Sequence, residues 1–210
     1  MKIALTLLSL TLVAGLHAKT FEGDLTIAVE ADGESQEMSV TTKGDKMSIK
    51  LPELGGGFAL MDWGSKIAKI VMPEQRMFLE APAADLAPGV PEVGEGEVEV
   101  TNETKDILGF TTRKVIFTSG TDSATLWMTS DLGSFTMMGG LDSQQAPAEF
   151  RQAFPNGALA LEMIYTDGEE SATVRITAVN PRSVATTELE VPKGYSKMSL
   201  PDGMNFPGMP

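Results

Sequence analysis

Apolar and polar residues alternate with a period of two from residue 20 to residue 51. This spacing places every second side chain on one face of an extended strand. Turn residues separate three such runs, because Asp32-Gly33 and Gly44-Asp45 suit the positive-φ positions of tight hairpins. The pattern therefore predicts a three-stranded meander with one buried face, made by Leu25, Ile27, Val29, Met38, Val40, Met47, Ile49 and Leu51.

A second group of three strands is predicted at residues 58–63, 66–72 and 75–80. Apolar residues occupy consecutive positions here, as at Ile70 and Val71, so they cannot all point to one side of a sheet. We therefore expect this part of the sheet either to be covered on both faces or to line a cavity.

Further strand patterns follow after a loop that is rich in proline, glycine and acidic residues and spans residues 81–96. Asn156-Gly157 and Asp167-Gly168 are strong hairpin signals among them. The predicted strands cover residues 112–118, 124–129, 158–165, 172–179 and, as a last short strand, 186–191.

One short amphipathic helix is predicted from about residue 144 to residue 154, with Phe150 and Phe154 on its apolar stripe. These elements together predict a mainly β protein. Its architecture is expected to be a single antiparallel curved sheet or open half-barrel, with one or two short helices as a lid.

The first eighteen residues have the layout of a secretory signal peptide, because Lys2 precedes an apolar run at residues 3–13 and small residues lead to Ala18. This run is shorter than the ~20 residues of a membrane-spanning helix. We expect cleavage after Ala18, a periplasmic or secreted location and no membrane span afterwards; an uncleaved N-terminal anchor is the alternative. The remaining sequence predicts one β domain at 19–196 and a flexible Met/Pro tail at 197–210.

The composition excludes several kinds of chemistry. The chain has no cysteine and a formal net charge of −13, which disfavours nucleic acids and anionic lipid surfaces as partners. Its one histidine, His17, would leave with the signal peptide. Zinc sites, histidine bases and Ser–His–Asp triads are then excluded. We expect no enzyme, no cofactor and no metal, although a pair of carboxylates could still serve a glycosidase.

Methionine is frequent, with 13 residues against two tryptophans and two tyrosines. Its flexible side chain fills irregular apolar space and adapts to variable ligands. Methionines in the tail, such as Met198, Met204 and Met209, could in addition bind Cu(I), although their spacing is loose. If a cavity is present, we expect residues of the less polar strands and of the helix to line it. The alternative for each of these residues is ordinary core packing. The candidates are Leu60, Trp63, Ile70, Met72, Phe78, Trp127, Met128 and Phe150.

Several short motifs resemble an exported bacterial family catalogued as domain of unknown function number 4412. They are Phe21-Glu22-Gly23, Lys43-Gly44-Asp45-Lys46-Met47, the run from Met72 to Phe78, Ile107-Leu108-Gly109-Phe110, Leu126-Trp127-Met128-Thr129 and Val191-Pro192-Lys193-Gly194-Tyr195.

The resemblance covers most of the chain and transfers no catalytic residue. Many relatives carry a cysteine after the Ile-Leu-Gly-aromatic turn, where this chain has Thr111-Thr112, so a role for that thiol is excluded here. The arrangement is also similar, more distantly, to periplasmic lipoprotein carriers and receptors, which are open half-barrels around an apolar cavity. That similarity implies a ligand with an acyl chain.

Two functions are therefore compared. The first is a periplasmic binding or carrier protein for a lipid-like hydrophobic ligand. The second is an envelope protein–protein interaction or structural module, which would use a sheet edge, the acidic loop or the tail. An enzyme that works with carboxylates alone is a third alternative.

Overall fold

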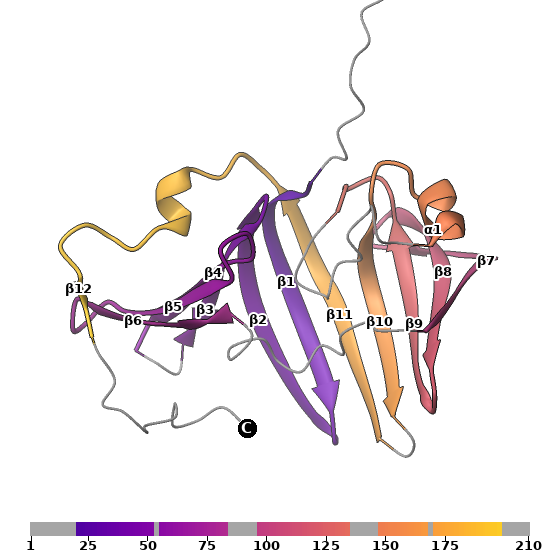
Figure 1. The fold of residues 1–210 in the computed structure, drawn as a ribbon, viewed down its shortest axis with the longest axis horizontal. Coiled ribbons are helices and arrows are strands. Elements are labelled where there is room, and N and C mark those ends of the chain that lie inside the picture. The colour runs from indigo at the N-terminus through magenta and orange to yellow at the C-terminus, as the bar shows by residue number, and fades with distance from the viewer. Residues whose placement is uncertain (1–19, 53–54, 84–95, 135–146, 168–169, 199–210) are drawn as a thin grey trace, which may run out of the picture.

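The computed structural model describes residues 20–52, 55–83, 96–134, 147–167 and 170–198. Twelve strands form one open, curved sheet in the order β12-β6-β5-β4-β3-β2-β1-β11-β10-β9-β8-β7 (Figure 1). The expected fold class is therefore confirmed. The strands are β1 Glu22–Ala31, β2 Glu34–Lys43, β3 Lys46–Leu51, β4 Gly57–Asp62, β5 Ile67–Met72, β6 Met77–Pro82, β7 Glu97–Ile107, β8 Phe110–Ser119, β9 Asp122–Thr129, β10 Leu159–Asp167, β11 Glu170–Pro181 and β12 Ser196–Lys197.

Strand β1 joins two antiparallel meanders at the middle of the sheet. On one side it pairs with β2, and the chain continues strand by strand to β6. On its other side β1 pairs with β11, from which the neighbours run back through β10, β9 and β8 to β7 at the edge. The predicted first meander is confirmed, and its turn residues Asp32 and Gly33 have φ of 53° and 79°.

The sequence pattern missed β7. Its alternating Val98 and Val100 are followed by a polar run, and its pairing with β8 shifts register between Val100 and Thr104. The turn that joins β7 to β8 also lacks a typical hairpin sequence. Leu108 and Gly109 have φ of 54° and 81°, as in a two-residue type I′ hairpin, but leucine is not a residue that this turn favours.

Leu108→Asn is therefore expected to stabilise the protein by about 1 kcal/mol, because asparagine tolerates positive φ better than leucine does. Asp32 already occupies the equivalent backbone position in the β1–β2 turn. Urea unfolding would measure the gain. Leu108→Ala is the control: it removes the exposed apolar side chain but lacks the short polar side chain that favours positive φ, so an equal gain from alanine would contradict the explanation.

The predicted strand at 186–191 is wrong. Thr186–Leu189 forms a 3-10 helix, η4, and the chain then runs on to β12 (Figure 1). The buried side chains of Val184 and Leu189, together with polar contacts described below, hold this segment across the sheet instead of beside a neighbouring strand. We call residues 182–198 the C-terminal strap.

The strap ends in the one parallel pairing among the described strands. Ser196 and Lys197 of β12 lie beside Met77 and Phe78 of β6. The backbone N–H of Met198 donates to the carbonyl oxygen of Phe78 at 2.8 Å. The tail that was expected from residue 197 therefore begins inside a strand, and its remainder, 199–210, lies outside the described residues.

Helix α1, Ala148–Ala153, lies within the predicted helix, whose first residues 144–146 are outside the described part. Most of the predicted loop, 84–95, and the predicted signal peptide at 1–18 are also outside it. Phe150 and Phe154 are buried, with ring centroids 4.9 Å apart. They belong to a cluster, here the second core, with Val115, Phe117, Leu126, Met128 and Ala160.

The larger cluster, here the central core, lies against β1–β5, β10 and β11. Its fully buried members include Leu25, Ile27, Val40, Met47, Leu161 and Ile176. Leu25 is opposite Val40, and the cross-strand row continues through Ile49 and Ala59 to Ile70. Residues directly opposite each other point to the same side of a sheet. We call this side the core face.

Strands β4 and β5 are buried on both faces, as their sequence predicts. Ala59 and Ile70 lie on the core face, whereas Leu60 and Val71 point the other way and are also buried. The strap runs over this opposite face, since Arg182 and Val184 donate hydrogen bonds to Asp24 and Glu22, which alternate with Leu25 in β1 and so point away from the core face.

Candidate functional site

The core face is the candidate binding surface, because its apolar side chains are not all fully covered. Val29 of β1, Val174 of β11 and Met163 of β10 are consecutive cross-strand neighbours, and each is half-buried. Met38, opposite Ile27, is half-buried as well. We call Val29, Met38, Met163 and Val174 the apolar stripe. It packs against the central core on one side and the second core on the other.

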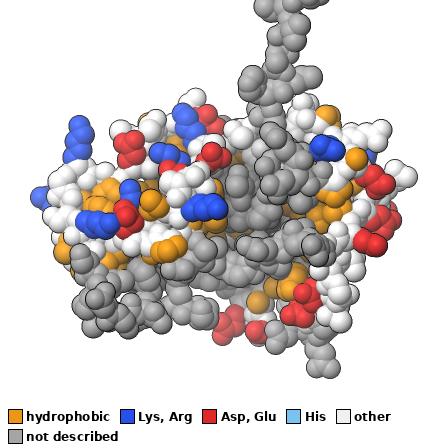
Figure 2. Space-filling view, viewed as in Figure 1, with side chains coloured by type: hydrophobic (Ala, Val, Ile, Leu, Met, Phe, Trp, Pro, Cys, Tyr) orange, Lys and Arg blue, Asp and Glu red, His pale blue; other side chains and the backbone are white. Residues whose placement is uncertain are grey.

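Hydrophobic side chains also gather in two areas of the molecular surface seen in Figure 2, one over the strands β3–β6 and one near α1. Their positions match the two clusters of strands that flank the centre of the sheet in Figure 1.

Four of the eight predicted lining residues lie in or against the two cores, and a fifth shares the core face. Ile70 is buried in the central core, and Trp63, just after β4, packs against the same cluster. Met72 shares the face of Ile70 by strand alternation and is half-buried. Met128 and Phe150 are brought together in the second core.

The other three predicted residues point to the opposite face. Leu60 is buried there, and Phe78 lies opposite Val71 on the same side. Trp127 lies between Leu126 and Met128 in β9 and therefore points away from the second core. The eight residues are thus divided between the two sides of the sheet. The structure brings together only Ile70 with Trp63 and Met128 with Phe150.

Trp63 has a distinctive polar group. Its main-chain N–H donates to the carbonyl oxygen of Asp45 at 2.9 Å, which fixes the residue at the end of the β3–β4 pair. Its side-chain Nε1 is buried and has no hydrogen-bond partner in the described part of the chain. Buried donors without a partner are rare in folded proteins.

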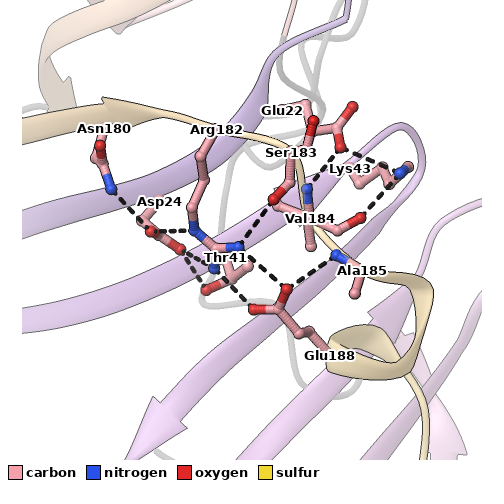
Figure 3. Close-up of polar contacts among 10 residues, drawn as sticks. All are labelled: Glu22, Asp24, Thr41, Lys43, Asn180, Arg182, Ser183, Val184, Ala185 and Glu188. Atoms are coloured by element: carbon pink, nitrogen blue, oxygen red, sulfur yellow. Dashed lines mark hydrogen bonds and ion pairs between the residues drawn. The ribbon is translucent and has the colours of Figure 1, made fainter.

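The strap is anchored to β1 by a polar network centred on Arg182 (Figure 3). The guanidinium donates to both carboxylate oxygens of Asp24, at 2.7 and 2.8 Å, and to both of Glu188, at 2.8 and 3.1 Å. Asp24 also accepts hydrogen bonds from Thr41 and Asn180. The hydrogen bonds from Arg182 hold the pKa values of Asp24 and Glu188 below their usual range.

A second anchor lies beside it. The N–H of Val184 donates to Glu22 at 2.7 Å, and the Val184 carbonyl accepts from Lys43 at 2.9 Å (Figure 3). The backbone hydrogen bond from Val184, followed by the one from Lys43, lowers the pKa of Glu22. Both networks serve to hold the strap in place, and sequence reasoning missed them because their members are up to 162 positions apart.

A third polar group lies on the face opposite the core. Lys105 Nζ is 4.3 Å from the centre of the Trp127 ring and contacts Glu162 at 2.5 Å, while Arg175 donates to the other Glu162 oxygen at 3.0 Å. Burial raises the pKa of Glu162, but the hydrogen bonds from Lys105 and Arg175 outweigh it, so the pKa is lowered. Because Trp127 is already covered by a cation, this group is better suited to bracing β7 against β10 than to holding an apolar ligand.

An acid pair occurs where β9 begins and β10 ends. Asp122 is opposite Asp167, and repulsion between the two carboxylates raises the pKa of Asp167. Asp167 is exposed. A glycosidase needs its two acids on either side of a bond in a cleft, so this pair does not match that arrangement. In the described ranges no three His, Cys, Asp or Glu side chains form a metal site.

A hollow of about 490 Å³ opens where β7 begins and β8 ends. Gly96, Glu97, Thr118, Ser119 and Gly120 line it. An acyl chain needs an apolar lining, so this open, polar hollow is a poor match for such a ligand. No helix within the described ranges has the length and apolar content to cross a bilayer.

Three solved structures of known proteins show some similarity to this chain. PNGF-II is 15% identical with a TM-score of 0.44, and the match covers 83% of this chain but only 30% of PNGF-II. LprF from Mycobacterium bovis is 12% identical with a TM-score of 0.36, covering 77% of this chain and 89% of LprF. A DUF1329 family protein from Desulfovibrio piger is 7% identical with a TM-score of 0.36, covering 82% and 91%. Similarities at this level do not bear on function.

The sequence itself gives the firmer assignment. No curated protein matches it. The profile of the family described as Domain of unknown function (DUF4412) matches residues 21–195, which is most of the chain, and the protein therefore belongs to this family.

Proposed function

We propose that this protein is an exported, non-enzymatic protein that binds a lipid-like hydrophobic ligand on the core face. The observation that carries the proposal is the apolar stripe. Incompletely covered apolar side chains on neighbouring strands are costly in water and are typical of binding surfaces. A ligand with an acyl chain would complete their burial.

The composition of the stripe supports this ligand class. Two of its four members are methionines, whose flexible thioether side chains adapt to an apolar ligand of variable shape. Burying apolar surface stabilises by roughly 25 cal/mol per Å², so covering these four side chains would contribute usefully to affinity. Export follows from the signal-like layout of residues 1–18, and the absence of histidine and cysteine after residue 18 supports a role without catalysis.

One observation favours an envelope interaction module as a second candidate. Strand β7 is 11 residues long and lies at the edge of the sheet, with the exposed Leu108 in the turn that follows it. Edge strands can pair with another chain. The acidic and lysine side chains along β7 are a common protection against such pairing, so we place this candidate second.

Mass spectrometry of material extracted from the natively purified protein would test the proposal. We expect a co-purifying lipid at close to one equivalent. Val174→Asn, which places an amide in the apolar stripe, should strongly reduce that amount. Thr177→Asn is the matched control, because it changes an exposed residue of the same strand and should leave the lipid bound. Equal lipid in both variants, or none in the unaltered protein, would contradict binding at this stripe, provided that circular dichroism shows both variants folded.

A further inference from the structure

The indole of Trp63 lies at one end of the core face. It packs against the central core, whose nearest strands contribute Met47 and Met61, and its own backbone is held by the hydrogen bond to Asp45. Side-chain packing therefore leaves the ring in a mainly apolar setting. The one polar atom of that ring, Nε1, is the buried side-chain donor without a partner.

Apolar packing alone does not explain a tryptophan at this position. A buried donor that lost its hydrogen bond to water and gained none in return destabilises the folded state. Phenylalanine would fill much of the same space without that cost. The indole N–H is a donor only, so whatever satisfies it must present an acceptor atom.

We propose that Trp63 Nε1 donates a hydrogen bond to the acyl carbonyl oxygen of the bound ligand. This inference rests on the proposed function and makes it more specific: the ligand class is an acyl compound, such as a fatty ester or fatty acid, and a plain hydrocarbon lacks the required acceptor. The hydrocarbon chain would lie against the half-buried side chains of the core face, and the carbonyl group would lie at the Trp63 end of that face. Trp63 thereby determines specificity, while the apolar stripe provides affinity common to all apolar ligands.

Ligand competition measures this directly. A fluorescent apolar probe, N-phenyl-1-naphthylamine, is bound to the full chain and displaced by methyl laurate, lauric acid or tridecane. Trp63→Phe is expected to weaken displacement by methyl laurate about three- to tenfold, the range of one net hydrogen bond, and to leave displacement by tridecane unchanged. The lauric acid arm distinguishes a free carboxylate from an ester as the source of the acceptor oxygen.

Trp127→Phe is the matched control, because Trp127 lies on the opposite face and its replacement should change neither ligand. An equal loss for methyl laurate and tridecane in Trp63→Phe would mean that the indole acts by packing alone, and no loss for either would mean that water satisfies Nε1. Both results would overturn the inference while leaving ligand binding intact. Failure of the unaltered protein to bind the probe or any of the three ligands would instead refute the proposed function.

Discussion

Gly23→Ala is expected to destabilise the protein by about 3 kcal/mol or more. A Cβ at this position would lie 2.3 Å from the carbonyl oxygen of Asn180, 2.9 Å from Pro181 Cα and 3.0 Å from the Arg182 nitrogen. All three are backbone atoms, so no side-chain rotation relieves the clash. The chain would have to break the Gly23–Pro181 pairing of β1 with β11, and Arg182 would then move away from its carboxylate partners.

Gly33→Ala is the control that separates the effect of the steric clash from the effect of a positive φ. Gly33 also has a positive φ, at 79°, but nothing lies within 4 Å of its Cβ position. Its replacement should therefore cost only about 1 kcal/mol. Urea unfolding of both variants gives the comparison, and failure of Gly23→Ala to fold would be the extreme form of the expected result. Equal losses would show that the strap and β11 can shift away from β1 without penalty.

Ile27→Ala is expected to cost about 2–5 kcal/mol, the usual range for removing a large aliphatic side chain from a core. Ile27 has no exposed surface, and its cross-strand neighbours are Met38 of β2 and Ile176 of β11. Removing its side chain would leave a cavity in the strand that joins the two meanders. Ile164→Ala is the control, because Ile164 is 38% exposed and its loss should have a much smaller effect.

The two tryptophans make this experiment a test of the predicted single domain. Trp63 lies in the meander that runs from β1 to β6, and Trp127 lies in the other one. The halves are joined by the β1–β11 pairing and again by the strap. We expect Trp63→Phe and Trp127→Phe proteins each to unfold in one transition, with the same midpoint by the remaining tryptophan as by circular dichroism, and Ile27→Ala to lower the midpoint in both backgrounds. Separate transitions would mean that the halves are independent units.

The strap also affects how the core face can be used. It lies on the opposite side of the sheet, where the hydrogen bonds from Arg182 to Asp24 and from Val184 to Glu22 hold it. A ligand on the core face would therefore bind without displacing it.

The sequence by itself determined the strands and turns that depend only on residues close together in the chain. Alternating apolar residues fixed β1, β2 and β3, and Asp32-Gly33 supplied the positive φ that their first hairpin needs. Export and the absence of histidine and cysteine chemistry are likewise predictions that residue types alone can support. The predicted helix stripe was correct because Phe150 and Phe154 are four positions apart, which places them on one side of a helix.

Tertiary structure decided the features that depend on distant residues. Strand β7 was missed because an edge strand need not bury a regular face. The pattern of residues 186–191 predicted a strand, but residues 186–189 form a turn of 3-10 helix, which Arg182 links to Asp24 through Glu188. The sequence also could not assign the faces. Ile70 and Leu60 look alike as apolar strand residues, but the pairing register, together with the register shift at Leu161, decides which side of the sheet each residue points to. The candidate site depends on which face each residue occupies, because side chains along a strand point alternately to the two sides of the sheet. Only the pairing of neighbouring strands brings side chains of several strands together on one surface.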